Sequence, residues 1–344
     1  SARLVAAISV MQAVQGYYAV FFQKYSNRTQ GMFTKDRRFP EEPLRLPCRF
    51  LCSYWRILLF LRKSGIICNE VDCSERDRQM RIFISADMEG ISTVATRDDS
   101  TRGTADYPFH ARQMTEEVAA ACEGAIRAGA TEILIKDAHD EGLNIDVNRL
   151  PSCAKLIKGW SGHPYGMVEG IDSSFDACMF VGYHAAAGSE GNPLSHTISH
   201  KNFSVKMNGR SVSEFMIYSY VAALEGVPVV FLSGDKQICQ ESEELHPAIV
   251  TAAVKEGRGA SVLSLQPRQA CDLIREKAEL SLKRNLSEAR IVLPEEFNVE
   301  ICYHDHTEAE RMSYFPGVIK TAPRTITFKT KDYFEVKRLF TFVL

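Results

Sequence analysis

The chain has 344 residues, of which 45% are hydrophobic and 24% are charged, and its formal net charge is −2. This length is sufficient for one large domain or two modest ones, each with a substantial core. The near-neutral balance argues against nucleic acid as a partner, because nucleic-acid-binding surfaces are strongly basic.

Residues 1–79 differ in character from the rest of the chain. They show no sustained helical or strand period, so we predict an N-terminal extension outside the functional fold. Within it, residues 4–23 carry no charge and are long enough to be considered as a membrane helix. Three glutamines, a serine and a glycine weaken that signal, and we expect no membrane segment. The ten cysteines form no CxxC pair, which favours reduced thiols and a cytoplasmic location.

From Met80 onwards, short apolar runs alternate with amphipathic segments. This alternation predicts an α/β fold with a mostly parallel central sheet flanked by helices. The Asn208-Gly209 pair predicts a β-hairpin insertion, and we expect a smaller α+β portion at the C-terminal end. Strands are predicted over 80–87, 131–138, 178–185, 228–235 and 248–257, and helices over 107–130, 213–227, 241–247 and 266–284.

Potential metal ligands follow three of the predicted strands. Asp87 and Glu89 end the first, Asp137 and His139 end the second, and His184 ends the third. In parallel sheets the ligand crevice lies at the carboxyl ends of the strands, so these side chains should meet at one edge. Oxygen and nitrogen ligands without cysteine suit zinc or another divalent first-row ion, and more than four ligands suit two ions.

Two further residues are candidates for the same site. Glu214 opens the helix after the hairpin and would add a ligand, although the helix dipole alone favours an acid there. His196 follows a stretch rich in glycine and small residues, and a histidine on such a loop suits general acid–base catalysis. His200, in the same segment, is a competitor for that role.

Each residue taken singly also has a purely structural explanation. Asp87 or Glu89 could cap the following helix or pair with Arg97, and His139 and His184 could be ordinary histidines at strand ends. Their joint position at one edge of the predicted sheet favours a metal site over these explanations.

The motifs together resemble the DppA-type D-aminopeptidase family, binuclear zinc peptidases that act on peptides with D-amino acids at the amino terminus. The resemblance spans residues 80–344 and implies that they form the catalytic domain. The motifs are ADMEGIS at 86–92, KDAHD at 136–140, MVEGID at 167–172, FVGYHAAAG at 180–188, LSHTI at 194–198, the long run at 208–235, TAAVKEG at 251–257 and EAERMSYFPGV at 308–318.

This resemblance implies a role for each candidate residue. Two zinc ions per subunit would be held by Asp87, Glu89, His139, His184 and Glu214, with Asp87 as the bridge. His196 rather than His200 would be the catalytic residue. The implied reaction is hydrolysis of the first peptide bond by metal-activated hydroxide. Independently of the resemblance, Asp137 lies two residues before His139, and it is expected to support the ligands from behind if its side chain turns inward.

The resemblance also implies the partners. The substrates would be short peptides with an N-terminal D-amino acid, for example D-Ala-D-Ala, and the assembly would be a homo-oligomeric ring, a decamer in the family. Two alternatives stay open: a metal-dependent amidase or peptidase of the same fold with a non-D substrate, and a non-catalytic, metal-stabilised, ring-forming binding protein.

Two departures from the family pattern stand close to the ligands. Lys136 and Ala138 replace the Asn and Ser of an Asn-Asp-Ser-His run, and Ser213 replaces a glycine before Glu214. The ligands survive both changes, but Lys136 is expected to alter the charge near the site and with it the substrate preference.

Overall fold

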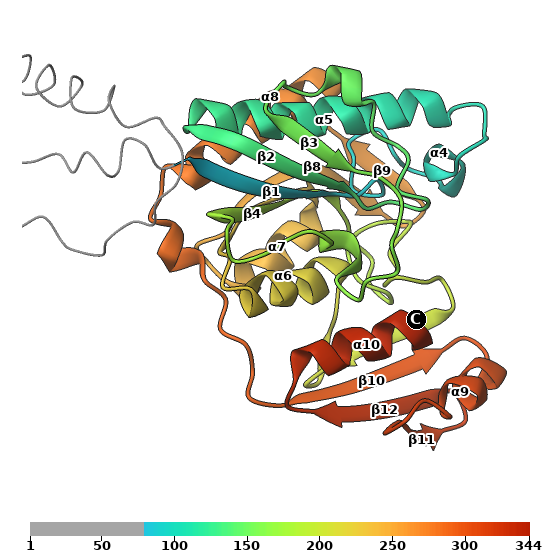
Figure 1. The fold of residues 1–344 in the computed structure, drawn as a ribbon. Helices are drawn as coiled ribbons and strands as arrows, with labels where there is room; N and C mark the ends of the chain where they lie inside the picture. Colours follow the sequence, from blue (N-terminus) through green and yellow to red (C-terminus); the bar gives the residue numbers. More distant parts are fainter. Residues whose placement is uncertain (1–78) are drawn as a thin grey trace, which may run out of the picture. The chain divides into compact units, whose positions relative to one another are not determined.

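The computed structural model describes residues 79–344 (Figure 1). The predicted extension over residues 1–79 and its uncharged stretch at 4–23 therefore lie outside the described residues, apart from residue 79. In the part of the chain that is described, no helix is long and apolar enough to cross a membrane.

A seven-stranded sheet forms the centre of the structure and confirms the predicted α/β fold. Its strand order is β3-β2-β1-β4-β7-β8-β9, and every neighbouring pair is parallel except β8 and β9. The strands are β1 (Met80–Ala86), β2 (Ala130–Asp137), β3 (Ala154–Ile157), β4 (Ala177–Tyr183), β7 (Val229–Asp235), β8 (Val250–Arg258) and β9 (Ser261–Ser264).

Helices cover both faces of this sheet, as Figure 1 shows. On one face lie α5 (Tyr107–Arg127) and α8 (Pro267–Leu282), and on the other lie α6 (Glu214–Leu224) and α7 (Lys236–Leu245). Residues of β1 alternate between the two cores: Ile82 and Ile84 pack in the cluster with α5 and α8, and Phe83 packs in the cluster with α6. This period of two is the pattern of a strand buried on both faces.

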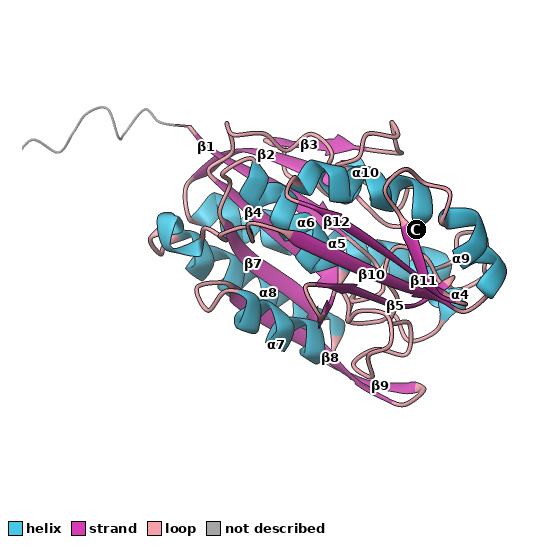
Figure 2. Ribbon diagram, turned by 90° about the horizontal axis from the view of Figure 1, so that it is seen from below, coloured by secondary structure: helices cyan, strands magenta, loops and turns pink. Residues whose placement is uncertain are grey.

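A second sheet is antiparallel, with the order β11-β12-β10-β5-β6. The hairpin β5 (Asn202–Met207) and β6 (Arg210–Ser211) turns at Asn208 and Gly209, whose φ angles of 52° and 81° suit the expected tight turn. The other strands are β10 (Phe297–Tyr303), β11 (Ile319–Ala322) and β12 (Thr325–Thr330). The predicted hairpin insertion and the predicted C-terminal portion thus form one sheet (Figure 2).

The C-terminal helix α10 (Tyr333–Val343) connects this second sheet to the rest of the domain. It packs against β10 and β12 on one side and α6 on the other (Figure 1). The Tyr333 hydroxyl donates to the Ile217 carbonyl of α6 at 2.6 Å. The short elements are α4 (Arg97–Ser100), α9 (His306–Met312) and the 3₁₀ turns Val147–Arg149, Gly166–Val168 and Leu286–Ala289.

Two of the differences between the observed and the predicted boundaries bear on the site. Helix α7 begins at Lys236 rather than at residue 241, because the Asp235 side chain accepts a hydrogen bond from the Ile238 N–H and caps it. Strand β1 ends at Ala86, so Asp87 and Glu89 lie in the loop beyond it and not in the strand.

The strand order explains where a ligand site can form. The chain passes from β1 to β2 on one side and returns on the other side as β4, so the strand order reverses at β1. Crevices form at such reversals, outside the carboxyl ends of the strands. The loops after β1, β2 and β4, which carry the predicted ligands, all begin there.

Candidate metal centre

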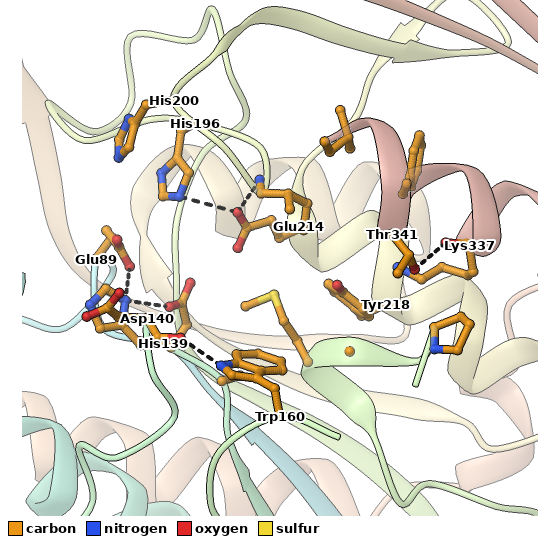
Figure 3. A pocket seen from close by; sticks show the side chains of 18 of the residues that line it. Glu89, His139, Asp140, Trp160, His196, His200, Glu214, Tyr218, Lys337 and Thr341 are labelled. Atoms are coloured by element: carbon orange, nitrogen blue, oxygen red, sulfur yellow. Dashed lines mark hydrogen bonds and ion pairs between the residues drawn. The ribbon is translucent and has the colours of Figure 1, made fainter. Parts of the chain in front are cut away.

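The structure brings the five predicted ligands and His196 together at this edge of the sheet (Figure 3). The loop after β1 supplies two carboxylates, the loops after β2 and β4 supply one imidazole each, and the first residue of α6 supplies a third carboxylate. All five predicted ligands are buried: Asp87, Glu89, His139, His184 and Glu214.

Asp87 lies at the centre of the cluster. Its Oδ1 is 3.4 Å from His139 Nδ1, and its Oδ2 is 3.6 Å from His184 Nε2. Glu89 Oε2 lies 3.0 Å from His139 Nδ1, and Glu214 Oε2 lies 3.7 Å from His184 Nε2. Asp87 therefore directs one oxygen towards each imidazole, which is the position that a bridging carboxylate requires.

Backbone carbonyls orient both imidazoles. His139 Nε2 is 2.8 Å from the Ser100 carbonyl, and His184 Nδ1 is 2.9 Å from the Ala185 carbonyl. A carbonyl only accepts, so these nitrogens carry the protons. In each neutral ring the other nitrogen then directs its lone pair at the carboxylates, as histidine ligands of metals do.

Several ligand atoms of the cluster have no hydrogen-bond partner. Among the described residues, Asp87 Oδ2, Glu89 Oε2 and His184 Nε2 are buried and unsatisfied. Leaving such groups unpaired costs about 1–3 kcal/mol each. The Asp87–Glu89–His184 and His184–His196–Glu214 sets each place their ligand atoms within 4.8 Å of one another. These oxygen and imidazole donors fit zinc.

The buried charges of the cluster also favour a bound cation. Burial raises the pKa of Asp87 well above its usual range, and the neighbouring charge of Glu89 raises it further, while His139 opposes this. Burial disfavours the charged form of His139, but Glu89 and Asp87 outweigh it and raise its pKa well above the ordinary value. A bound cation would relieve the repulsion between the two carboxylates.

The structural explanations for Asp87 and Glu89 do not hold. Helix α4 is capped by Thr96 and Asp99. Within residues 79–344, the ion-pair partners of Asp87 and Glu89 are histidines and not Arg97.

His196 lies at the mouth of the cluster, closer to it than His200. Its Nε2 is 3.5 Å from Glu214 Oε1, and its Nδ1 is held 2.9 Å from the Leu194 carbonyl. The ring stacks between His184, with centroids 4.5 Å apart, and His200, at 4.3 Å. The geometry thus places His196 at the metal cluster and His200 one ring further out.

The loop that carries His196 is anchored by the buried side chain of Asn192. Asn192 is buried, and its side-chain amide donates to the Glu89 carbonyl at 3.0 Å and to Asp235 Oδ2 at 3.2 Å. Asp235 Oδ2 also accepts from the Ala185 N–H at 2.9 Å. Asn192 and Asp235 therefore fix the loops of Glu89 and His184 to each other.

Further along this loop the backbone is strained. Ile198 has a φ of 63°, which is costly for a β-branched residue, and its N–H donates to Glu214 Oε1 at 2.6 Å. The strained peptide holds the Glu214 carboxylate in place.

Sequence reasoning missed Asn192, Asp235 and Lys255. Lys255 is buried, and its ammonium donates to the backbone carbonyls of Glu89 and Val94. Asp235 ends β7 as Asp137 ends β2, so the strand-end signal could have identified it. Asn192 in a glycine-rich stretch and Lys255 within a strand carry no comparable signal.

Asp137 supports the site through the backbone of the His139 loop. Its carboxylate accepts from the N–H groups of Asn144 and Ile145 at 2.6 and 2.8 Å. The Asn144 side chain in turn donates to the His139 carbonyl at 2.7 Å. Asp137 thus orders the segment that carries His139 and does not itself face the cluster.

The two departures from the family pattern have structural roles. Lys136 is buried, donates to the Gly159 carbonyl and lies 4.0 Å from the centre of the Trp160 ring. The side chain of Lys136 therefore holds the Trp160 loop, and its expected effect on the charge near the site stays a prediction. Ser213 caps α6, and its hydroxyl accepts from the Met216 N–H at 3.3 Å.

Gly90 allows the loop after β1 to lie directly against β4. Its N–H donates to the Gly182 carbonyl at 2.8 Å, and an added Cβ would lie 1.9 Å from the Tyr183 carbonyl oxygen. We expect Gly90→Ala to separate Glu89 from His184 and to destabilise the fold by about 1–3 kcal/mol, a typical cost of overpacking. Urea unfolding of the variant and of wild type measures this loss of stability. An unchanged midpoint for Gly90→Ala would show that this close approach is not needed.

A cavity of about 600 Å³ opens next to the cluster. Its lining includes four of the five predicted ligands, Asp87, Glu89, His139 and Glu214. Trp160, whose indole N–H donates to the Asp140 carbonyl at 2.7 Å, lines one side. Tyr218 of α6 and residues 337–344 at the C-terminal end line another side (Figure 3). The space can therefore hold a small ligand in contact with the candidate metal ligands.

A family model described as D-aminopeptidase, peptidase family M55, matches residues 80–342. The chain is 34% identical over 258 residues to a D-aminopeptidase of Bacillus subtilis (strain 168), which covers 74% of this chain and 93% of the relative. It is also similar to the solved structure of the zinc-dependent D-aminopeptidase DppA from Bacillus subtilis, described as a self-compartmentalizing protease. The TM-score is 0.71 at 32% identity, over 77% of this chain and 96% of that one.

Proposed function

The chain belongs to the D-aminopeptidase family, peptidase family M55, and on that basis we propose that it removes N-terminal D-amino acids from short peptides such as D-Ala-D-Ala. The family resemblance and the enzyme class expected from the sequence motifs, a metallo-aminopeptidase, are confirmed. The identity of the peptide and the roles of the individual residues belong to the proposal.

We propose that Asp87, Glu89, His139, His184 and Glu214 hold two zinc ions, with Asp87 between them. The observation that carries this assignment is the set of buried, unsatisfied ligand atoms of Asp87, Glu89 and His184, residues that form one of the two candidate metal sets. Zinc in this position would act as a Lewis acid and lower the pKa of a water molecule towards neutrality.

His196 supplies the proposed contribution of a side chain to catalysis. The Leu194 carbonyl fixes the His196 ring, so Nε2 faces the cavity edge beside Glu214. From there it can hydrogen-bond the carbonyl oxygen that gains charge or deliver a proton to the departing amine. His196 also belongs to one of the candidate metal sets, so a ligand role competes with this one.

The assembly is proposed to be a homo-oligomeric ring, with the decamer of the family as the specific expectation. The description of the solved relative as self-compartmentalizing supports it. Residues 80–344 are proposed as the catalytic domain, which the start of the family match at residue 80 supports. The extension over 1–79 and the cytoplasmic location stay predictions from the sequence.

The test is hydrolysis of D-Ala-D-Ala and of L-Ala-L-Ala by the zinc-loaded protein, with and without a chelator. We expect cleavage of the D-peptide only, its loss on chelation and its return when zinc is restored. Cleavage confined to the L-peptide would favour the amidase or peptidase with a non-D substrate. Zinc binding without any cleavage would favour the non-catalytic binding protein.

A further inference from the structure

Lys337 of α10 lines the cavity with its charged group. The residue is only 2% exposed, and its Nζ lies 4.0 Å from the centre of the Tyr218 ring. Within residues 79–344 the ammonium has no hydrogen-bond acceptor and no carboxylate partner. Burial lowers the pKa of Lys337 to about 7, against the attraction of Glu214.

The other buried lysines of the described chain are different. Lys136 donates to the Gly159 carbonyl, and Lys255 donates to the Glu89 and Val94 carbonyls. A buried cation without a hydrogen-bond acceptor is unfavourable, and the rings of Tyr218 and Phe340, whose centres lie 4.0 and 5.8 Å from Nζ, offset only part of that cost. Lys337 therefore lacks an anionic partner that the cavity has room to admit.

Its place relative to the metal cluster limits what that anion can be. Tyr218 follows Glu214 by four residues on α6, a separation of about 6 Å along the helix. Figure 3 shows Glu214, Tyr218 and Lys337 following one another across the cavity. An extended peptide advances about 3.3–3.6 Å per residue, so a carboxylate one or two residues beyond the cleaved bond comes within reach of Lys337.

We propose that Lys337 binds the C-terminal carboxylate of the peptide substrate and thereby selects di- and tripeptides with a free carboxyl end. This proposal rests on the proposed function, whose substrate class it makes more specific. Another cation that lines the cavity, Arg97, is exposed, so water screens its charge and weakens its hold on a carboxylate.

The experiment compares D-Ala-D-Ala with D-Ala-D-Ala amide, which lacks the negative charge. Wild type is expected to cleave the free acid with a kcat/KM roughly 10- to 150-fold higher, the range of a hydrogen bond to a charged group. Lys337→Met should lose the preference for the free acid, cleave the amide as wild type does and keep its zinc. Lys337→Arg should restore part of the preference for the free acid. Lys329→Met, an exposed lysine of β12 outside the cavity, is the matched control.

Three outcomes overturn the proposal while the proposed function stands. These are equal cleavage of acid and amide by wild type, an equal loss for both peptides in Lys337→Met, and loss of the preference in Arg97→Met instead. Failure of the proposed function is recognised separately, because wild type then cleaves neither peptide. In that case, calorimetric binding of acid and amide to the zinc-loaded protein and its Lys337→Met variant decides the role of Lys337.

Discussion

Replacing Asp87 by asparagine is expected to remove zinc and to lower kcat/KM by about a thousandfold or more, the scale of several kcal/mol of lost metal stabilisation. Asp87 directs one oxygen to His139 and the other to His184, so no other side chain of the cluster can replace it. Elemental analysis of the purified variant and hydrolysis of D-Ala-D-Ala measure the two effects. Glu117→Gln is the matched control, because Glu117 is a buried carboxylate bound to Ser92 and Gln113 outside the cluster.

The same substitution should not lower the stability of the metal-free protein. Without a cation, Asp87 is buried beside Glu89 and its charge is disfavoured. A neutral asparagine relieves that repulsion, so we expect metal-free Asp87→Asn to unfold at the same denaturant concentration as metal-free wild type, or higher. Zinc should stabilise wild type alone. Retention of both zinc ions by Asp87→Asn would refute the bridging role.

For His196→Ala we expect full zinc content and an unchanged oligomer, with kcat lower by about 10²- to 10⁴-fold, the usual contribution of a general acid or base. The Nε2 of His196 faces the cavity beside Glu214, whereas His200 stacks behind it. His200→Ala is therefore the control, and its kcat should stay within a few-fold of wild type.

The zinc content of His196→Ala distinguishes the two roles of this residue. If one zinc per subunit is lost together with activity, His196 is a ligand with His184 and Glu214 and not the acid–base group. A larger loss of activity in His200→Ala than in His196→Ala would reverse the assignment made from the sequence.

The parts of the site that the sequence predicts are those with a local signal. Asp87, His139 and His184 each follow an apolar run, and the parallel arrangement of those runs is enough to bring them to one edge of the sheet. Asp87, predicted as the last residue of the first strand, lies beyond β1, which ends at Ala86. The two carboxylates converge because Gly90 bonds the loop to β4.

What the sequence could not predict depends on contacts between distant segments. Asn192 reaches Glu89 across about a hundred residues, and Lys255 reaches the same loop from β8. Lys337 meets Tyr218 only because the C-terminal helix packs against α6. The side chain of Lys136 turns to Trp160 rather than to the site, which depends on the packing of the 158–166 loop. None of these contacts has a periodic or spacing signal.

The central claim is that two metal ions act together in the cluster around Asp87. Titration of metal-free protein with zinc, followed by D-Ala-D-Ala hydrolysis after each addition, tests it most directly. We expect activity to rise until about two equivalents of zinc per subunit are bound and then to stay constant. Full activity at one equivalent, or activity that does not depend on zinc, would contradict it.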